Sequence, residues 1–535
     1  MKSAARTIVI CPFATPNGPL HAGHLAGPYL AGDVYARYLR AGGREVVFPM
    51  GTDDNQTYVA TVAAKRGITP AELLAESAGG VRRGLEAAGI STDGFVPAAP
   101  TNTEEILRFL VALREAGKLV PRDVPLPYSR ARGEFLLDGL VTGECPNCLD
   151  TTCGGICETC GHPVDYAVMR ELTSTLDPAD PVVLRDTPVL VLPMEDYRRQ
   201  LAEFHANRPY RWRPGIEQLI LDLLDRPLLD LPITYPISRG IPAPFAETPG
   251  QVINPWAEAM AQCMHGTWYV QRDEAAESPG ADERVDRHWL ASTETELVYF
   301  LGFDNAANWA MTYLALLMAH GERYLRPSAI VCNEFYELDH AKFSTSRGHA
   351  VWATDLMSEV PRDAARFYLA LTSPEHRGSN FHRRELATLV TRRLIEPWNA
   401  LGDALGKACV GLEPGAVLEV GAQGRRRAAV LAARLRSNYE LPRFSIARAA
   451  ESVVGQLERL RVRADRMASR PHRTELADLL FEVRTLFAFA APILVDAAAR
   501  GAAGGVDLAP EPGGSSVPVF ALPRLEPLID EAEAR

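Results

Sequence analysis

Two histidines near the start of the chain and one lysine past its middle are residue types that bind phosphate. His21 and His24 close the segment Pro16–His24, which reads Pro-Asn-Gly-Pro-Leu-His-Ala-Gly-His. Lys342 opens a second segment, Lys342–Gly348, which reads Lys-Phe-Ser-Thr-Ser-Arg-Gly. Imidazole and ammonium groups hydrogen-bond to anionic oxygens, and glycine lets the backbone approach a ligand closely. Together the two segments predict ATP chemistry.

The elements around the first segment fit a phosphate-binding arrangement. The apolar run Thr7–Cys11 precedes it and is typical of a buried strand. Apolar residues at helical spacing follow the histidines, namely Leu25, Tyr29, Leu30, Val34, Tyr38 and Leu39. The N-terminus of such a helix offers unpaired N–H groups and positive potential to an anion. Either segment alone is also compatible with a surface helix start or a polar loop.

A cysteine cluster predicts a metal site. Five of the nine cysteines lie within sixteen residues, and four of them form two Cys-x-x-Cys pairs, Cys145 with Cys148 and Cys157 with Cys160. This spacing suits tetrahedral zinc, and four thiolates leave no open position for water, so we expect a structural site. Cys153 and His162 are competing ligands, since either could replace one member of the set.

Length and composition indicate a multidomain globular protein. The chain has 535 residues, with 47% hydrophobic and 23% charged residues. No stretch reaches membrane-spanning length, and the first apolar run is too short for a signal peptide, so we expect a cytoplasmic protein with no membrane partner.

Charge is unevenly distributed along the chain. The net charge is −11, yet residues 381–480 carry 18 Arg and Lys against 11 Asp and Glu, which makes this segment +7 and the remainder −18. A basic module on an acidic body fits RNA docking. The alternative, that these arginines solvate helix faces, is weighted equally, because no aromatic residues are interleaved with them.

The paired segments resemble a known family. His-x-Gly-His after a first strand, with Lys-x-Ser-x-Ser several hundred residues later, resembles the signatures of class I aminoacyl-tRNA synthetases, and the Pro-Asn-Gly lead-in resembles the methionyl member. The resemblance implies an α/β fold in which a Rossmann-type parallel sheet is split by a zinc-knuckle connective insertion and followed by an α-helical bundle domain. The expected bounds are 1–117 for the first catalytic half, 118–230 for the insertion with its knuckle at about 140–165, 231–354 for the second half with the lysine loop, 355–500 for an anticodon-binding-like bundle and 501–535 for a loose tail.

Local patterns add detail to this expectation. Glu45–Met50 reads as a second strand that ends at the residues Gly51–Asp54. The insertion is rich in proline and is expected to be irregular around the knuckle. Helical spacing resumes beyond residue 355, and Val517–Phe520 is expected to pack back on the bundle.

The resemblance also implies a reaction and its residues. An amino acid and ATP, with Mg²⁺, would give an aminoacyl adenylate and pyrophosphate, and the acyl group would pass to an acceptor. The implied catalytic residues are His21, His24, Lys342 and Arg347. The implied ATP- and adenylate-binding residues are Asn17, Gly18, Gly23, Gly302, Ser344 and Ser346. The implied amino-acid-binding residues are Phe13, Thr15, Asp53, Tyr235, Asp304, Asn308 and Trp309, and the structural zinc would be held by Cys145, Cys148, Cys157 and Cys160.

Several positions depart from the family pattern. The second loop lysine is replaced by Thr345, with Arg347 as a partial substitute. In the amino-acid pocket, five positions that usually carry an aromatic residue or a histidine in the family carry a different residue here. These are Thr15, Tyr235, Asn308, Trp309 and Tyr313. Thioether recognition relies on soft packing against aromatic rings, so this rearrangement predicts a substrate other than methionine. The segment Arg461–Pro471 lacks the aromatic residues that stack on anticodon bases.

Three hypotheses follow. The preferred one is a repurposed, monomeric paralogue of the methionyl enzyme that still forms an aminoacyl adenylate and passes it to tRNA or to a small-molecule hydroxyl or amine acceptor. The second is a genuine methionine-tRNA ligase that charges tRNA(Met). The third, from a different class, is a non-catalytic protein that binds ATP or tRNA.

Overall fold

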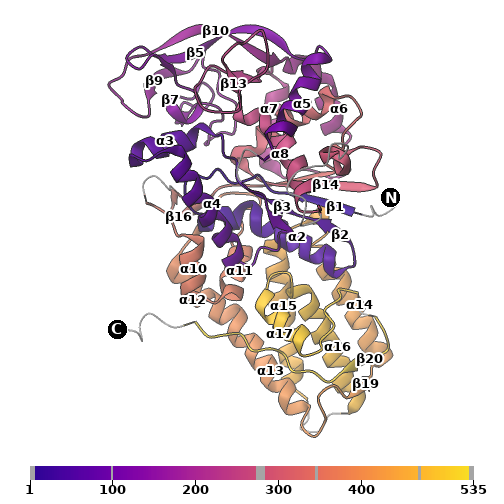
Figure 1. Cartoon of the computed structure of the whole chain (residues 1–535). Helices are drawn as coiled ribbons and strands as arrows, with labels where there is room; N and C mark the ends of the chain where they lie inside the picture. The colour runs from indigo at the N-terminus through magenta and orange to yellow at the C-terminus, as the bar shows by residue number, and fades with distance from the viewer. Residues whose placement is uncertain are drawn as a thin grey trace.

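The computed structural model describes residues 6–97, 101–272, 284–343, 348–467, 472–511 and 513–528. Figure 1 shows an elongated molecule with an insertion at the top, a parallel sheet in the middle and a helical bundle at the bottom. In the part of the chain that is described, no helix combines the length and apolarity that crossing a bilayer requires.

The central sheet is parallel, as the sequence predicts. Its order is β15-β14-β1-β2, with β1 at Arg6–Ile10, β2 at Glu45–Val47, β14 at Thr295–Gly302 and β15 at Ala329–Asn333. β1 pairs with β14 although nearly 290 residues separate them, so the sheet is assembled from two halves of the chain. The expected second strand divides into β2 and β3 (Pro49–Met50), and β3 pairs in parallel with β4 (Gly94–Phe95).

The helix behind β1 is interrupted just after the histidines. It runs through α1 (Ala22–His24), a π-helical turn at Leu25–Tyr29 and α2 (Leu30–Ala41). Pro28 lies inside the turn and has no N–H to donate, so nearby carbonyls need other partners. The side chain of Asn333, at the end of β15, donates to the carbonyls of Ala26 at 3.2 Å and Gly27 at 2.8 Å. The start of this helix is thereby tied to the end of a neighbouring strand.

The expectation that the insertion is irregular is wrong. It contains a four-stranded antiparallel sheet of order β11-β10-β5-β6, with β5 at Val120–Ser129, β6 at Glu134–Phe135, β10 at Val182–Leu192 and β11 at Leu231–Pro232. The prolines of β5 are all at odd-numbered positions, 121, 125 and 127, so their backbone groups lie on the same edge of the strand. The carbonyl of Pro127 accepts a hydrogen bond from the N–H of Leu136, on the edge away from β10. Their missing N–H groups therefore fall outside the β5–β10 ladder, where proline is tolerated.

The knuckle has a small sheet of its own. β7 (Val141–Glu144) pairs with β8 (Thr151–Cys153) and β9 (Arg170–Ser174). The helices of the catalytic and inserted regions are α3 (Thr57–Arg66), α4 (Pro70–Ala87), α5 (Thr103–Glu115), α6 (Arg198–Ala206), α7 (Pro214–Leu224), α8 (Pro255–Tyr269) and α9 (Tyr313–Ala319). Short strands complete this part: β12 (Thr234–Tyr235), β13 (Val252–Ile253), β16 (Tyr336–Leu338), β17 (Ala341–Lys342) and β18 (Ser379–Phe381).

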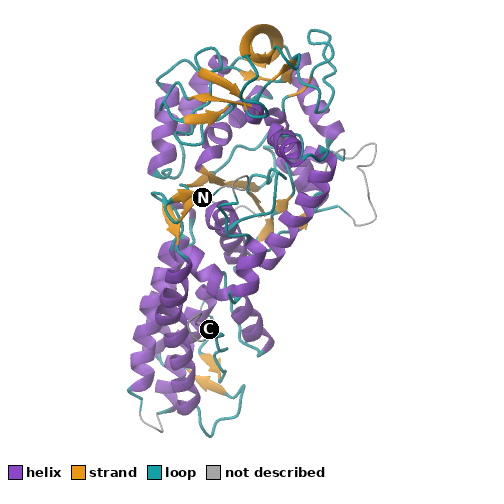
Figure 2. Cartoon of the chain, turned by 90° about the vertical axis from the view of Figure 1, so that its left-hand side faces the viewer, coloured by secondary structure: helices purple, strands orange, loops and turns teal. Residues whose placement is uncertain are grey.

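The C-terminal region is helical, as expected, and Figure 2 shows its helices packed lengthwise below the sheet. The helices are α10 (Ala353–Glu359), α11 (Arg362–Leu371), α12 (Arg383–Val390), α13 (Glu396–Ala408), α14 (Ala422–Arg436), α15 (Ile446–Asp465), α16 (Arg473–Ala490) and α17 (Val495–Ala503). Many arginines of the bundle are ion-paired: Arg427 and Arg463 both contact Glu482, which is fully buried, and Arg461 pairs with Glu458 and Asp465. This pairing favours the helix-solvating alternative for these three residues.

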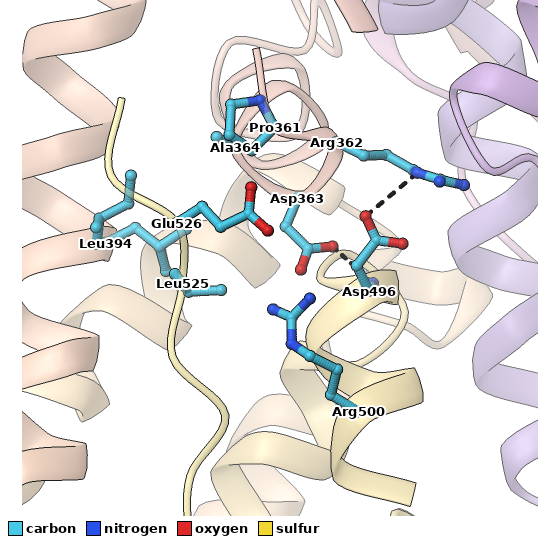
Figure 3. Close-up of a pocket in the computed structure, with 10 residues that line it drawn as sticks. Pro361, Arg362, Asp363, Ala364, Leu394, Asp496, Arg500, Leu525 and Glu526 are labelled. Atoms are coloured by element: carbon cyan, nitrogen blue, oxygen red, sulfur yellow. Dashed lines mark hydrogen bonds and ion pairs between the residues drawn. The ribbon is translucent and has the colours of Figure 1, made fainter. Parts of the chain in front are cut away.

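The chain beyond residue 500, expected to be loose, packs on the bundle where it is described. β20 (Ser516–Pro518) pairs with β19 (Val417–Glu419), and Val517 and Phe520 are buried, as expected for Val517–Phe520. Figure 3 shows a small cavity, about 60 Å³, between the start of α11, α17 and this C-terminal segment. Beside it, the carboxylate of Asp363 accepts the backbone N–H groups of Asp496 and Ala497 at 2.9 and 2.8 Å, which caps α17.

Candidate active site and metal centre

The two histidines stack on each other at the N-terminus of α1. Their ring centroids are 3.7 Å apart, and the backbone N–H of His21 donates to Nδ1 of His24 at 3.1 Å. Burial lowers the pKa of His24 to about 4, so its imidazole is neutral near pH 7. Since Nδ1 accepts a bond, the ring proton resides on Nε2, which makes His24 a hydrogen-bond donor toward a phosphate oxygen.

His21 is neutral as well. Burial, then the neighbouring His24 and then the charge of Lys342 lower the pKa of His21 to about 2. The two predicted phosphate-binding segments meet in space, because Phe343, the residue after Lys342, stacks on His21. Neutral imidazoles would hold a triphosphate through N–H donation rather than through charge.

Phe343 covers the histidines from the second segment. Its ring stacks on His21 with centroids 4.7 Å apart and planes 12° from parallel. A Cβ at Gly23 would lie 3.0 Å from His21 Nδ1 and 3.2 Å from Phe343, so a side chain here would crowd the stacked rings.

Lys342 lies at the start of the second segment, on β17. Its ammonium pairs with the carboxylate of Glu158 and lies 5.4 Å from the ring centroid of Phe335. Ser344, Ser346 and Arg347, together with Thr345, lie outside the described residues. Their expected roles stay predictions.

Asp53 is partly buried beside the Pro-Asn-Gly loop. Its backbone N–H donates to the carbonyl of Ala14 at 3.0 Å, and its Oδ2 accepts from Gln56 Nε2 at 2.8 Å. Its buried Oδ1 has no hydrogen-bond partner in the described part of the chain. Burial, opposed by the Gln56 hydrogen bond and reinforced by Asp54, raises the pKa of Asp53 to about 7. An unpartnered carboxylate oxygen of this kind is a ready acceptor for an ammonium group.

Glu258 is a second buried carboxyl near Asp53 that the sequence reasoning missed. It is fully buried on α8 and accepts hydrogen bonds from Asn55 Nδ2 at 3.0 Å and Gln262 Nε2 at 3.1 Å. Burial and then the charge of Asp53 raise the pKa of Glu258 well above its usual range. A signal existed in the sequence, because two polar residues four apart interrupt an otherwise apolar helix.

Asp304 follows β14 directly, at the edge of the sheet where β1 also ends. A Cβ at Gly302 would lie 2.7 Å from Asp304 Oδ1, so the glycine makes room for this carboxylate. Burial and then the charge of Glu158 raise the pKa of Asp304, while Lys342 opposes that rise. Asp304 therefore lies within electrostatic reach of the Glu158–Lys342 pair.

Asn308 and Trp309 begin a second π-helical turn, Asn308–Thr312, and both are buried. Trp309 contacts Tyr299 and Tyr313 edge to face, with centroids 4.9 and 5.4 Å apart. The carbonyl of Ala310 in this turn accepts from His205 Nε2 at 2.9 Å. The proton of His205 is on Nε2 because Trp212, which can only donate, bonds to its Nδ1 at 3.1 Å. His205 and Trp212 were not predicted.

Tyr235 has a different environment from the other predicted pocket residues. Its hydroxyl lies 3.5 Å from Asp138 Oδ1, a carboxylate that also accepts from Tyr166 and Trp256. Burial raises the pKa of Asp138 to about 6. Tyr235 packs in a separate cluster with β5 and β10 rather than with Trp309.

The Pro-Asn-Gly loop is partly exposed beside Asp53. Ala14 forms a parallel bridge with Thr52, and Asn17 donates its N–H to Thr15 at 2.9 Å. Thr15, Asn17 and Gly18 are partly accessible, as a ligand-contacting loop requires. Phe13 is placed inward, since a Cβ at Gly51 would lie 3.1 Å from its ring and one at Gly266 of α8 only 2.9 Å.

The four predicted cysteines converge in the knuckle. Their sulfur atoms all lie within 4.8 Å of one another, with Cys145 Sγ 3.8 Å from Cys160 Sγ and Cys148 Sγ 3.7 Å from Cys157 Sγ. Zinc–sulfur bonds of about 2.3 Å in a tetrahedron place the sulfurs about 3.8 Å apart, so the residues fit zinc. The competing ligands lie outside the group: Cys153 is on β8, and His162 Nδ1 is 3.1 Å from the carbonyl of Cys160.

We expect Cys157→Ser to lose zinc and Cys153→Ser to keep it. Purified wild type should contain about one zinc per chain, because four thiolates at tetrahedral spacing form a closed site. Removing one ligand should reduce this to well under half and make the knuckle sensitive to limited proteolysis. Metal analysis of the two variants provides the measurement, and zinc retained by Cys157→Ser but lost by Cys153→Ser would contradict the ligand set.

Comparison with protein families identifies one match over most of the chain. The model of a family described as tRNA synthetases class I (M) matches residues 7–403. Similar curated proteins include methionine–tRNA ligases of Pyrococcus horikoshii, 32% identical over 406 residues, and of Christiangramia forsetii, 29% identical over 399 residues. The matched part is 73% and 74% of this chain but 54% and 56% of those relatives, so the alignments span about half of each relative's length.

Solved structures agree on the fold. A Mycobacterium tuberculosis methionyl-tRNA synthetase in complex with methionyl-adenylate superposes with a TM-score of 0.71 at 20% identity. The superposition covers 98% of this chain and 99% of that one. The likeness thus includes the parallel sheet, the insertion and the helical region.

Proposed function

The chain belongs to the class I tRNA synthetase family, and from this premise we propose that it activates an amino acid with ATP to form an aminoacyl adenylate. The observation that carries the proposal is the stacking of Phe343, the residue after Lys342, on His21, which itself stacks on His24. These two segments offer donors for a triphosphate. Asp304, which lies within electrostatic reach of Lys342, and Asp53, which bonds through its N–H to Ala14, offer acceptors for a substrate ammonium.

The proposed reaction is a displacement at phosphorus. A carboxylate oxygen of the amino acid bonds to the α-phosphorus of ATP, the bond from that phosphorus to the bridging oxygen breaks, and pyrophosphate leaves with the electron pair. Negative charge grows on the departing phosphates, so donors aimed at them lower the barrier. We assign this role to His24 Nε2–H and to the Lys342 ammonium, and we expect Mg²⁺ to enter with ATP as part of that substrate.

The amino acid would be oriented through its ammonium group. The unpartnered Oδ1 of Asp53 would accept the substrate ammonium, and Asp304 would lie near the same ammonium and the ribose. In the second half-reaction a hydroxyl or amine of the acceptor attacks the acyl carbon, AMP leaves, and the acceptor loses a proton.

We infer that the preferred amino acid is not methionine. A thioether is bound by polarizable, apolar surroundings. Here the buried Glu258, with its amide partners Asn55 and Gln262, lies near Asp53, and Tyr235 directs its hydroxyl to Asp138. A genuine methionine-tRNA ligase is the second candidate, favoured by the names of the similar curated proteins.

ATP–pyrophosphate exchange with each amino acid separately tests the activity and the substrate. We expect exchange that depends on one amino acid and is at least tenfold faster with it than with methionine. Ordinary exchange with methionine and none faster would establish the second candidate. No exchange with any amino acid would refute activation and support a non-catalytic role.

The acceptor is tested by charging. We propose a small hydroxyl- or amine-bearing acceptor, because Arg461–Met467 offers no aromatic ring for base stacking and the three bundle arginines described above are ion-paired. Bulk tRNA should then remain uncharged with the preferred amino acid under conditions where exchange is rapid. Stoichiometric acid-precipitable aminoacylation of tRNA would overturn this part of the proposal.

The pH dependence of exchange should report the ionisation of Asp53. Its pKa of about 7 leaves the carboxyl mostly neutral at pH 6 and mostly ionised at pH 8, and only the ionised form attracts an ammonium. We therefore expect kcat/KM for the amino acid to rise about tenfold from pH 6 to pH 8. Asp53→Asn, which cannot ionise, should be both weak and flat over this range, and a wild-type profile equally flat would argue against the assignment.

A further inference from the structure

One ion pair joins the metal knuckle to the predicted phosphate-binding lysine. Glu158 lies between Cys157 and Cys160, whereas Lys342 belongs to β17, 184 residues later. The side chains are half exposed, at 52% and 45% of their surface, so solvent and ligands can reach both. This side-chain contact therefore joins the knuckle to the segment that carries the lysine.

The ammonium of Lys342 lies within electrostatic reach of two groups at the predicted nucleotide site. Its charge affects the pKa of His21 and of Asp304, and that of Asp304 is also affected by Glu158. The lysine chain passes over the ring of Phe335, with Nζ 5.4 Å from the centroid. Within this cluster, the direct ion-pair partner of Lys342 is Glu158.

We propose that Glu158 is a positioning residue for Lys342, holding its ammonium beside the knuckle in the nucleotide-free enzyme until a triphosphate displaces the carboxylate. The proposal rests on the proposed ATP-dependent activation. It deepens that function by assigning to the knuckle a direct effect on the residue that contacts the departing phosphates.

The physical basis is a competition between two anions for one cation. A half-exposed pair of single charges is weak, whereas a triphosphate offers several charges and many acceptor oxygens to the same ammonium. A lysine suits the exchange because its charge is compact and its stem flexible, so it can turn from one anion to another. While the pair is formed, the ammonium is bonded to Glu158 and is not available to a triphosphate, so the apparent affinity for ATP is reduced according to the fraction of molecules in that state.

Site-resolved labelling tests the pair without any turnover. The chain has only five lysines, so acetylation by an amine-reactive reagent can be quantified at each one by peptide mass spectrometry. A carboxylate that stabilises the ammonium slows its reaction. Glu158→Gln should therefore raise labelling of Lys342 about two- to fivefold, with Lys65, Lys118 and Lys407 as internal references.

Kinetics test the consequence for ATP. Glu158→Gln should lower KM for ATP about two- to fivefold at low ionic strength, with kcat changing less, and the effect should disappear at high salt. The same substitution in a Lys342→Ala background should have no effect on KM. Glu158→Asp, which keeps the charge on a shorter stem, should fall between wild type and Glu158→Gln.

Glu144→Gln is the matched control. Glu144 lies on β7 of the same insertion and forms no ion pair with a described residue, so neither labelling nor KM should change. Zinc content of each variant verifies that the knuckle is intact. Unchanged labelling of Lys342 in Glu158→Gln, or a raised KM for ATP, would overturn the proposal. If the wild type catalyses no exchange, the proposed activity fails, and the labelling result then decides only whether Glu158 restrains the lysine.

Discussion

Replacing Lys342 by alanine is expected to slow adenylate formation by about 10²- to 10³-fold, the usual loss when one donor to a developing negative charge is removed. Lys342 belongs to the segment that contacts His21. Its electrostatic stabilisation of the transition state grows as negative charge moves onto the leaving pyrophosphate. We therefore expect kcat in ATP–pyrophosphate exchange to fall far more than KM for the amino acid rises.

The same substitution should leave the fold intact. Lys342 is half exposed, and its partner Glu158 lies on the surface of the knuckle, so the pair contributes little to stability. Lys407→Ala, which removes an exposed lysine of α13, is the matched control and should retain full exchange activity. A Lys342→Ala enzyme as fast as wild type would remove the basis of the proposed reaction.

Replacing Arg366 by alanine is expected to destabilise the protein by about 3–5 kcal/mol, because it leaves a buried carboxylate without its main counter-charge. Arg366 is 1% exposed and its Nη2 donates to Asp33 Oδ2 at 2.6 Å, where Asp33 is fully buried on α2. The same guanidinium donates to the carbonyls of Ala88 at 2.9 Å, Pro492 at 2.8 Å and Ile493 at 2.9 Å. It thus connects the catalytic sheet region to the helical bundle.

Urea denaturation of variants at both arginines that pair with Asp33 would measure this effect. Arg37 contacts the same carboxylate at 3.0 Å but is 30% exposed, so Arg37→Ala should cost much less. The double variant Arg366→Ala with Asp33→Ala should cost less than the sum of the single ones, since no buried charge is left unpaired. Equal losses for Arg366→Ala and Arg37→Ala would contradict the central role of the buried arginine. Because the molecule has several regions that can unfold separately, the urea midpoints should be measured with two spectroscopic probes and compared.

The fold was predictable where the relevant pattern is local. The apolar run at β1 is buried on both faces, as a parallel strand requires, and helical spacing beyond residue 355 predicted helices where α11 and α16 lie. The insertion was misjudged, because prolines usually exclude a strand. Only the pairing of β5 with β10 shows that all three prolines lie where β10 requires no N–H donor from them.

The site was predictable in part for the same reason. The histidines and the four cysteines could be proposed because each belongs to a short segment with characteristic spacing, whereas Asp53 was proposed only through the family resemblance. Glu258 was missed although it lies near Asp53, since about 200 residues separate the two and no short motif connects them.

The amino-acid sequence by itself determined the chemistry that the chain can offer: two imidazoles at a helix start, one lysine in a distant segment and four thiols in two pairs. Local spacing suffices for these, because the covalent chain and the geometry of helices and turns set distances between near neighbours. Tertiary structure alone decided that Lys342 meets Glu158, that Arg366 meets Asp33 and that Tyr235 faces Asp138. Contacts between residues far apart in the chain depend on how whole elements pack, and no short pattern records that packing.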